Sequence, residues 1–399
     1  MHYVQLHINP VNPAYFAQYH TIMQLKSLDF HNFGTRLNAW FHPSTTLLHD
    51  GRVFASMQEI NGSDHYGAPM FTLSNGLEER WSAPSEIPAF KRRTLEGTPF
   101  TEGVADVRPF TLQDGRVAVF GCTSHYTAKG NAFWDKEQTA KPPSGKAVYS
   151  IWSPDTGTWS GYGILELNGV TRSYRTACTQ AVLLDNNRIL LPIYLDSGKI
   201  CDFHGYTSPC FASMTAIYRI EASQLIWEAQ SDLLELPVLR GCVEPSAIRL
   251  ADSTFALTMR AEDGNMYRAV SVDGLAWRDM RPWRWDDGSP IETASTQQHW
   301  LRLGNKAYLV YTRNNGSNAT IARFRAPLYI AEADVENASL LRASERVVFP
   351  RQNHNGIEAR YGNFHCAPFG ENAAVVTDSA LFAEKGNMRT TVMASLVTC

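Results

Sequence analysis

Residues 106–122 read DVRPFTLQDGRVAVFGC, and this stretch decides the fold. Two runs of strand-forming residues flank Asp114-Gly115, a dipeptide that tolerates positive φ and closes tight hairpins. Neither run has the periodicity of a helix. The stretch therefore predicts two adjacent antiparallel strands, with a polar residue, Asp106, at the start of the first.

The same pattern occurs in five further segments, whose starts lie 53 to 72 residues apart. They are HPSTTLLHDGRVFASMQ from His42, CTQAVLLDNNRILLPIY from Cys178, EPSAIRLADSTFALTMR from Glu244, QQHWLRLGNKAYLVYTR from Gln297 and NFHCAPFGENAAVVTD from Asn363. A third, aromatic-rich strand follows most of these hairpins, as in KAVYSIWS at 146–153. A repeat of about 50 to 70 residues with four short strands is typical of a propeller blade.

We therefore predict an all-β fold, a single six-bladed β-propeller domain over residues 1–399, with a two-sheet sandwich as the alternative. Pairing of an N-terminal strand, HYVQLHI at 2–8, with a C-terminal one, TTVMASLV at 390–397, is expected to close the ring. Closure removes the exposed edges that an open stack of sheets would leave.

Composition narrows the functional classes. The formal charge is −3, from 36 basic and 39 acidic residues. This balance does not indicate a surface that binds nucleic acid or a membrane. No apolar run is long enough for a transmembrane helix, and the first residues do not resemble a signal peptide. A cytoplasmic location is expected, or a periplasmic or secreted one if a leader has been removed. The seven cysteines lack CxxC spacing, so we expect neither a disulfide framework nor a metal site.

The strand ends predict the position of the functional site. In a blade the first strand is innermost and the second is antiparallel to it, so the start of one and the end of the other share a face. A counting rule locates these ends. Eight residues back from the first turn residue of each hairpin, the first strands start at His42, Asp106, Cys178, Glu244, Gln297 and Asn363. About eight residues forward from it, the second strands end at Gln58, Cys122, Tyr194, Arg260, Thr312 with Arg313, and Asp378. We expect this face to bind carbohydrate.

Two carboxylates on one face, Asp106 and Glu244, are the minimum equipment for cleaving a glycosidic bond. Arginine offers a planar fork of donors that suits a substrate carboxylate, and Arg260, Arg323 and Arg325 are candidates. Two plainer readings stay open: strand ends are polar because they meet solvent, and Glu244 with Arg260 is a structural ion pair. No GxSxG elbow, P-loop or HExxH motif occurs.

Several stretches resemble the sialidase superfamily. SPDTGTW at 153–159 and SVDGLAW at 271–277 are similar to Asp-boxes, the Ser-x-Asp-x-Gly-x-x-Trp turns of sialidase blades. CVEPSAIRL at 242–250, followed by LTMRAEDG at 257–264, resembles the segment that carries a catalytic Glu and then an Arg of the substrate-binding triad. The resemblance implies that Glu244 is a catalytic carboxylate and that Arg260 binds the substrate carboxylate. ARFRAPLYIAEAD at 322–334 resembles the segment of a further triad Arg, here Arg323 or Arg325.

Two features differ from the sialidase pattern. WFHPS at 40–44 has His42 where sialidases carry Phe/Tyr-Arg-Ile-Pro, and the late nucleophilic tyrosine has no clear match, with His365 near that region. The first triad Arg is therefore missing. His42 is similar to the axial His of propeller lyases that act on ulvan and rhamnosyl-glucuronate, which also use a second His, a Tyr and an Arg. His65, Tyr126 and Arg175 are the loosely matching residues.

The sequence favours an exo-acting glycoside hydrolase that cleaves a terminal acidic sugar or a sugar linked to a uronate. A uronate lyase acting by β-elimination is the alternative, and a non-catalytic glycan-binding propeller is the second alternative. Asp106 and Glu244 are the predicted acid/base residues, and His42 transfers a proton or orients a group. The expected substrate-binding residues are Arg260, Arg325, Arg313, Gln58, His65, Tyr126, Arg175, Gln297, His299, Asn363 and His365. We expect an anionic oligosaccharide or glycan as the partner and no cofactor. The sequence leaves the oligomeric state open.

Overall fold

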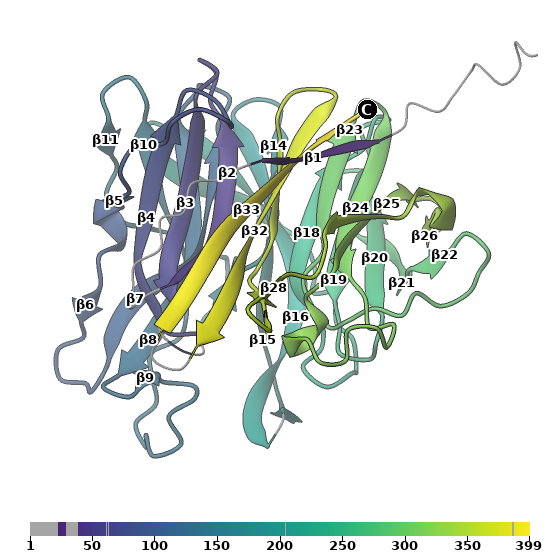
Figure 1. Cartoon of the computed structure of the whole chain (residues 1–399). Coiled ribbons are helices and arrows are strands. Elements are labelled where there is room, and N and C mark those ends of the chain that lie inside the picture. Colours follow the sequence, from purple (N-terminus) through teal and green to yellow (C-terminus); the bar gives the residue numbers. More distant parts are fainter. Residues whose placement is uncertain (1–22, 29–38, 61, 63, 204, 385–386) are drawn as a thin grey trace, which may run out of the picture.

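The computed structural model describes residues 23–28, 39–60, 62, 64–203, 205–384 and 387–399. Within this part of the chain, the strands form six sheets of at least four strands each and the small hairpin of β28 (Asn353–His354) and β29 (Ile357–Glu358). Each of the six larger sheets contains one of the six sequence repeats. Figure 1 shows the sheets standing side by side, with their strands running in roughly the same direction.

The first three sheets follow the chain in order. The first is β2 (Ala39–Leu47), β3 (Val53–Ile60), β4 (Tyr66–Ser74) and β5 (Ser85–Glu86). The second is β6 (Arg93–Thr94), β7 (Thr101–Thr111), β8 (Val117–Thr127), β9 (Gly130–Asn131), β10 (Ala147–Ser153), β11 (Thr158–Trp159) and β12 (Gly163–Ile164). The third is β13 (Tyr174–Arg175), β14 (Val182–Leu184), β15 (Arg188–Phe203), β16 (Tyr206–Glu221) and β17 (Gln224–Gln230).

The other three sheets also follow the chain in order, and their neighbouring strands are antiparallel except for β22 and β26, which pair parallel. The fourth is β18 (Val243–Arg249), β19 (Phe255–Arg260), β20 (Met266–Ser271) and β21 (Arg278–Pro282). The fifth is β22 (Arg284–Trp285), β23 (His299–Leu303), β24 (Lys306–Thr312), β25 (Leu328–Asp334), β26 (Ser339–Leu340) and β27 (Arg346–Phe349). The sixth is β30 (Arg360–Tyr361), β31 (His365–Pro368), β32 (Ala373–Glu384), β33 (Asn387–Thr398) and β1 (Gln24–Leu28). Short 3₁₀ helices are η2 (Pro88–Phe90), η3 (Ala322–Phe324) and η4 (Arg342–Ser344).

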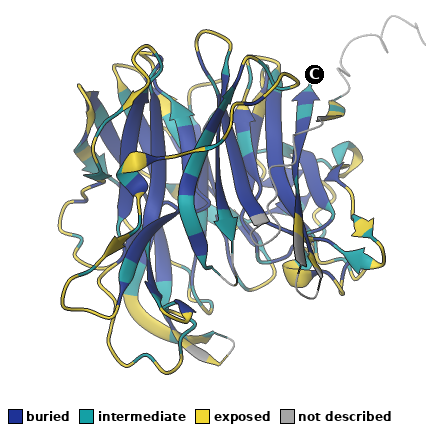
Figure 2. Cartoon of the chain, turned by 60° about the vertical axis from the view of Figure 1, so that its left-hand side comes forward, coloured by how far each residue is buried: buried dark blue, intermediate teal, exposed yellow. Residues whose placement is uncertain are grey.

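Hydrophobic clusters fill the spaces between neighbouring sheets. One cluster joins each consecutive pair from the first sheet to the sixth. A further cluster joins the sixth sheet back to the first, where Trp40 and Val53 pack with Val375 and Val392. Figure 2 shows the result, with buried strands in the interior and exposed residues in the loops. Because every sheet packs on two neighbours, the sheets form a closed ring, and the predicted all-β propeller arrangement is confirmed.

The ends of the described chain meet in the sixth sheet. β1, which precedes the first repeat, pairs antiparallel with β33, so that Gln24 lies opposite Thr398. This pairing joins the two ends of the chain and covers the outer edge of β33, as ring closure requires. The strand proposed at residues 2–8 lies outside the described residues.

The starts of the inner strands share an unusual backbone conformation. His42, Asp106, Cys178 and Glu244 have φ between 52° and 53°, in the left-handed region that non-glycine residues rarely occupy. Register shifts mark β-bulges at His42, Asp106 and Glu244, where two residues of the inner strand are left out of the ladder. Such strained positions tend to occur at functional sites. The counting rule thus selected structurally equivalent positions in four repeats.

The hairpin turns and the strand starts lie at opposite ends of the ring. The long hairpin of β15 and β16 and the loop around β9 extend beyond the sheets at the lower end in Figure 1. The segments that join second to third strands, such as 313–327 between β24 and β25, also lie at this end. We call this end of the ring, where the inner strands start, the loop end. We call the opposite end, where the hairpin turns lie, the turn end.

Candidate functional site

Asp106 gathers side chains from three sheets. Its Oδ1 lies 3.1 Å from Nδ1 of His42 and accepts a hydrogen bond of 3.0 Å from Nδ2 of Asn363. All three side chains are at least nine-tenths buried. The three residues start the inner strands of the second, first and sixth repeats, so the ring brings together positions that are up to 321 residues apart in sequence.

The environment of Asp106 keeps its carboxyl group ionised. Burial opposes ionisation, but the approach of His42 to 3.1 Å, followed by the charge of Arg108, holds the pKa of Asp106 well below its ordinary value. A carboxylate of this kind is suited to orienting a neighbouring imidazole and fixing its tautomer. It is poorly suited to donating a proton. The geometry therefore favours His42 over Asp106 as the proton-transfer group of this cluster.

Glu244 and Arg260 form a second cluster on neighbouring strands of the fourth sheet. Nη1 of Arg260 lies 2.9 Å from both carboxylate oxygens of Glu244, and its Nε donates to Ser295 Oγ at 3.1 Å. Burial disfavours the charge on Arg260, but Glu244 offsets this effect and raises its pKa. The predicted pairing of Glu244 with Arg260 is therefore present, and it engages one nitrogen of the guanidinium group, Nη1.

Two further arginines lie at the same end of the ring, on and after η3. Desolvation and then the charge of Arg325 lower the pKa of Arg323, and Arg260 acts in the same direction, whereas the charges of Asp64 and Glu244 raise it. Among the described residues, Arg325 donates one long hydrogen bond of 3.5 Å from Nη1 to the Tyr361 carbonyl, and its Nε has no partner. Like charges thus gather next to Glu244, an arrangement that an anionic ligand would stabilise.

Asp378 is a candidate that the sequence reasoning reached as a strand end but did not choose. It is 1% exposed, and burial raises its pKa to about 7, against the opposing effects of the Ser379 N–H and Arg325. Its Oδ1 accepts hydrogen bonds from the backbone N–H groups of Gly362 and Ser379, at 3.0 and 2.6 Å. Its Oδ2 has no partner among the described residues. A carboxyl group that titrates near pH 7 is the type of residue that acts as a general acid.

Gln58 lies where the counting rule placed it, but its amide nitrogen is already engaged. Nε2 donates to the carbonyls of Gly67 and Val104, at 3.1 and 2.7 Å, and so joins the first and second sheets. We expect Gln58→Leu to lower the free energy of unfolding by about 2 kcal/mol, because two backbone acceptors lose their donor. The substrate KM should stay unchanged. Urea denaturation and steady-state kinetics check this, and a raised KM with unchanged stability would instead support the predicted substrate contact.

Arg313 and Gln297, two further predicted substrate-binding residues, differ in whether the described residues supply partners for their polar groups. Arg313 is paired with Glu345 at 3.1 Å and lies over the Trp285 ring, at 5.4 Å from its centroid, so its charge is already balanced. Gln297 is 1% exposed, and neither its amide oxygen nor its amide nitrogen has a partner among the described residues. Gln297 therefore remains a candidate for a ligand hydroxyl.

The residues proposed from the lyase resemblance lie in the first three sheets and their loops. The rings of His65 and Tyr126 are 5.3 Å apart, and the Arg92 guanidinium lies 4.1 Å from the centre of the Tyr126 ring. Arg175 of β13 pairs in register with Tyr194 of β15. Their predicted role in substrate binding stays a prediction.

His299 and His365 lie deeper along the axis. Nδ1 of His299 is 2.9 Å from Ser246 Oγ, and the two imidazole rings are 5.5 Å apart. Burial, followed by the charge of Arg108, lowers the pKa of both well below the ordinary value, so both rings are neutral. His365 lines a cavity that lies toward the turn end, away from the face that is expected to bind carbohydrate.

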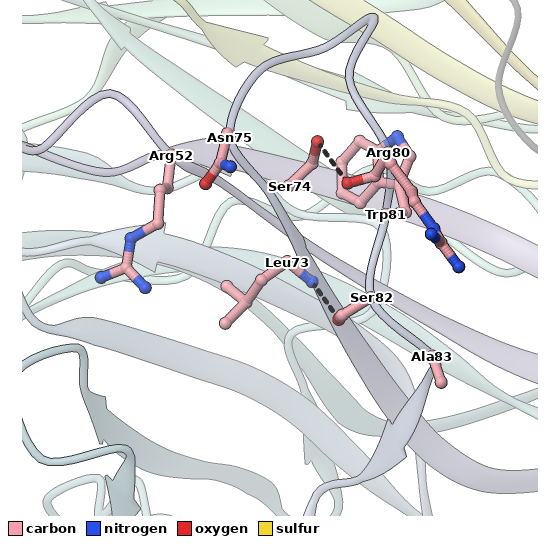
Figure 3. A pocket seen from close by; sticks show the side chains of 8 residues that line it. All are labelled: Arg52, Leu73, Ser74, Asn75, Arg80, Trp81, Ser82 and Ala83. Carbon is pink, nitrogen blue, oxygen red and sulfur yellow. Dashed lines mark hydrogen bonds between the residues drawn. The ribbon is translucent and has the colours of Figure 1, made fainter.

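A hollow on the outside of the first sheet is separate from these clusters. It measures about 540 Å³ and lies beside β4, where Leu73 N donates to Ser82 Oγ and Ser74 Oγ donates to the Arg80 carbonyl. Figure 3 shows Arg52, Arg80 and Trp81 around it. Its lining has no carboxylate or histidine, so it lacks the groups needed for acid/base chemistry.

The described residues contain neither a metal-binding cluster nor a helix that could span a membrane. No three His, Cys, Asp or Glu side chains in this part of the chain are grouped so as to hold a metal ion. Likewise, none of the described helices has the length and apolar character needed to span a membrane.

Comparison with solved structures identifies the type of propeller. A protein of unknown function from Dyadobacter fermentans has a TM-score of 0.62 at 15% identity, covering 95% of this chain and 100% of that one. The NanB sialidase from Streptococcus pneumoniae (K499G mutant) has a TM-score of 0.60 at 11% identity, covering 97% and 72%. The chain has a sialidase-like β-propeller fold. The intramolecular trans-sialidase from Ruminococcus gnavus is also similar, with a TM-score of 0.56 at 11% identity, covering 93% and 97%.

Sequence comparison adds no family assignment to this sialidase-like propeller, because no family model and no curated protein matches the chain. At identities of 10 to 15% the structural likeness concerns the fold alone. Function must therefore be argued from the side chains at the loop end.

Proposed function

We propose that the chain is an exo-acting glycoside hydrolase that cleaves a terminal acidic sugar or a sugar linked to a uronate. The observation that carries the proposal is the gathering of Arg260, Arg323 and Arg325 next to Glu244. Glu244 balances Arg260, whereas Arg323 and Arg325 form no ion pair among the described residues. Two arginines without a carboxylate partner suit the carboxylate of a sugar acid.

In the proposed reaction, two carboxyl groups act in different protonation states. Glu244 is the carboxylate on the reacting side, either as the base for water or as the group that faces the anomeric carbon. Asp378, whose pKa is about 7, is the candidate that donates a proton to the leaving oxygen. We also infer that each of the six sheets is one blade, so the six inner-strand starts form the ring of polar groups around the sugar.

A second candidate function is β-elimination on a uronate, and the contact between His42 and Asp106 favours it. An imidazole oriented by a carboxylate is a competent base for the C5 proton of a uronate, while an arginine neutralises the carboxylate. Both proposals recognise an acidic sugar through its carboxylate, but they break different bonds. Hydrolysis cleaves the bond between the anomeric carbon and the glycosidic oxygen, whereas elimination cleaves the bond between C4 of the uronate and its oxygen substituent and leaves an unsaturated sugar.

Product analysis tests the proposed function directly. Sialyl and uronate-terminated oligosaccharides, together with oligosaccharides that carry a sugar on O4 of a uronate, are incubated with the protein, and the products are examined by mass spectrometry and ultraviolet absorbance. Hydrolysis gives a free acidic sugar that has gained one water, without the absorbance of an unsaturated uronate. An unsaturated product would replace the hydrolase proposal with the lyase one. Binding without any product would contradict both and would support the glycan-binding alternative.

Replacing Asp106 with Asn separates the two reactions. If His42 is the base for elimination, we expect kcat to fall by about 10²-fold or more, because the imidazole loses the carboxylate that orients it. Hydrolysis through Glu244 should fall by less than about tenfold. The measurement is kcat for each product, with the unfolding midpoint as a check on the structure.

A further inference from the structure

A second cavity lies on the axis at the turn end of the ring. It has a volume of about 330 Å³ and is lined by one segment from the inner strand region of each of the six sheets. In the first two sheets these segments are 44–47 and 108–111, which follow the left-handed positions His42 and Asp106 toward the turns. The cavity is therefore distinct from the clusters at the loop end.

The walls of this axial cavity are mainly apolar, and its charges have one sign. Aliphatic and aromatic side chains such as Leu47, Phe110 and Ile248 form most of the surface. Three arginines also line it, Arg108, Arg249 and Arg302, and no Asp or Glu is among the lining residues. Arg249 is paired with Asp185 at 3.3 Å, whereas Arg108 forms no ion pair with the described residues. A cavity with apolar walls and an arginine that lacks a direct carboxylate partner favours an anion with an apolar portion.

The guanidinium group of Arg108 is the main indication that this cavity binds an anion. It is 9% exposed, and its Nη1 donates to the backbone carbonyl of Thr179. Its Nε and Nη2 have no partner among the described residues, and the guanidinium forms no ion pair with any of them within 4.0 Å. Nε and Nη2 form one edge of the guanidinium, the edge that binds both oxygens of a carboxylate. A buried charge without such a partner is costly.

His365 adds a second polar group to the same cavity. It is 3% exposed, and neither ring nitrogen has a partner among the described residues. A neutral imidazole has one N–H to donate, so it can complement the two donors of Arg108. Two buried polar side chains that line one cavity, each with unused donors, indicate that the cavity receives a ligand.

We propose that the axial cavity binds a small monocarboxylate with an aliphatic or aryl tail. The carboxylate lies against Nε and Nη2 of Arg108, with His365 beside it, and the tail packs between Leu47, Phe110 and Ile248. A volume of about 330 Å³ is at the lower end of small-molecule sites, which limits the tail to a few carbons. The site is additional to the proposed glycosidase site, because it opens at the other end of the ring.

Isothermal titration with hexanoate tests this proposal. The wild-type protein should bind hexanoate about tenfold or more tighter than hexanamide, which lacks the charge, and than acetate, which lacks the tail. Arg108→Met should lower the affinity by about tenfold or more, whereas Arg302→Met, which removes an exposed arginine of the same cavity, should change it by less than about threefold. Circular dichroism verifies that each variant is folded.

A second variant keeps the test decisive if Arg108→Met fails to fold. Ala181→Phe places a ring in the cavity and leaves Arg108 intact, so it should also abolish hexanoate binding. Absence of hexanoate binding to the wild type, or equal binding to the Ala181→Phe protein, would overturn the proposal. Equal affinity for hexanoate and acetate would overturn the inference that the ligand has an apolar tail. Glu244→Gln should bind hexanoate as the wild type does, which separates this site from the proposed glycosidase function.

Discussion

Replacing Glu244 with Gln is expected to lower kcat/KM on an acidic oligosaccharide by about 10²- to 10⁴-fold. The substitution keeps the shape of the side chain but removes the charge that the reaction needs and that Arg260 contacts through both oxygens. Because Arg260 is buried and loses its counter-charge, the free energy of unfolding should also fall by about 2 kcal/mol. Kinetics below the unfolding transition, combined with urea denaturation, measure both effects.

Glu102→Gln is the matched control for Glu244→Gln. Glu102 is also a buried glutamate in an ion pair, with Arg93 at 2.5 Å and His125 at 3.2 Å, but it lies in the second sheet outside the arginine group. We expect this variant to lose stability to a similar extent and to keep kcat/KM within about threefold. If both variants lost activity equally, Glu244 would have a structural role, and the proposed reaction would lose its carboxylate.

Replacing Asp378 with Asn should increase stability above pH 7. The pKa of Asp378 is raised from 3.8 to about 7, so between these values the folded state binds a proton that the unfolded state does not. Folding stability from this group is therefore largest below pH 3.8 and falls as pH rises through the window. Three pKa units correspond to about 4 kcal/mol, which is the upper bound of the gain in the variant at pH 8. The new amide hydrogens need partners, and this requirement reduces the gain.

The difference between the two proteins, measured by urea denaturation from pH 4 to pH 9, isolates Asp378 from the other titrating groups. Asp252→Asn is the control, because Asp252 lies exposed in a hairpin turn and Thr254 lowers its pKa. That variant should show no gain at pH 8. An Asp378→Asn protein that is less stable than the wild type at pH 8 would show that the carboxylate has a counter-charge in the folded state. Asp378 would then also no longer be a candidate for the general acid near neutral pH.

The local part of the fold could be predicted because hairpins are local. Asp50-Gly51 and Asp114-Gly115 close turns between strands that pair within the same repeat, and each repeat formed one of the six sheets. The counting rule found the left-handed positions of the inner strands because they stand at a constant distance from those turns. The left-handed conformation of these positions was not predicted. The residue types there differ between the repeats, and no single type that favours positive φ occurs at all of them.

The candidate site could be predicted only where its contacts follow the repeat. Glu244 and Arg260 face each other across one hairpin, so their pairing followed from strand register. The contact of Asn363 with Asp106 spans 257 residues and depends on how the ring closes. Arg108 was missed, although it is two residues beyond Asp106 on the same strand, because an arginine in an alternating strand gives no sign of whether it is paired.

The sequence by itself determined the repeat, the hairpins and the ring of polar strand starts, because these depend on residues close together in the chain. The tertiary structure alone decided which of those polar groups keep a charge. Burial raises the pKa of Asp378, and the approach of His42 holds that of Asp106 low, although both are aspartates at strand ends. Desolvation and charge proximity depend on the packing of six sheets around one axis, and no local pattern in the chain encodes them.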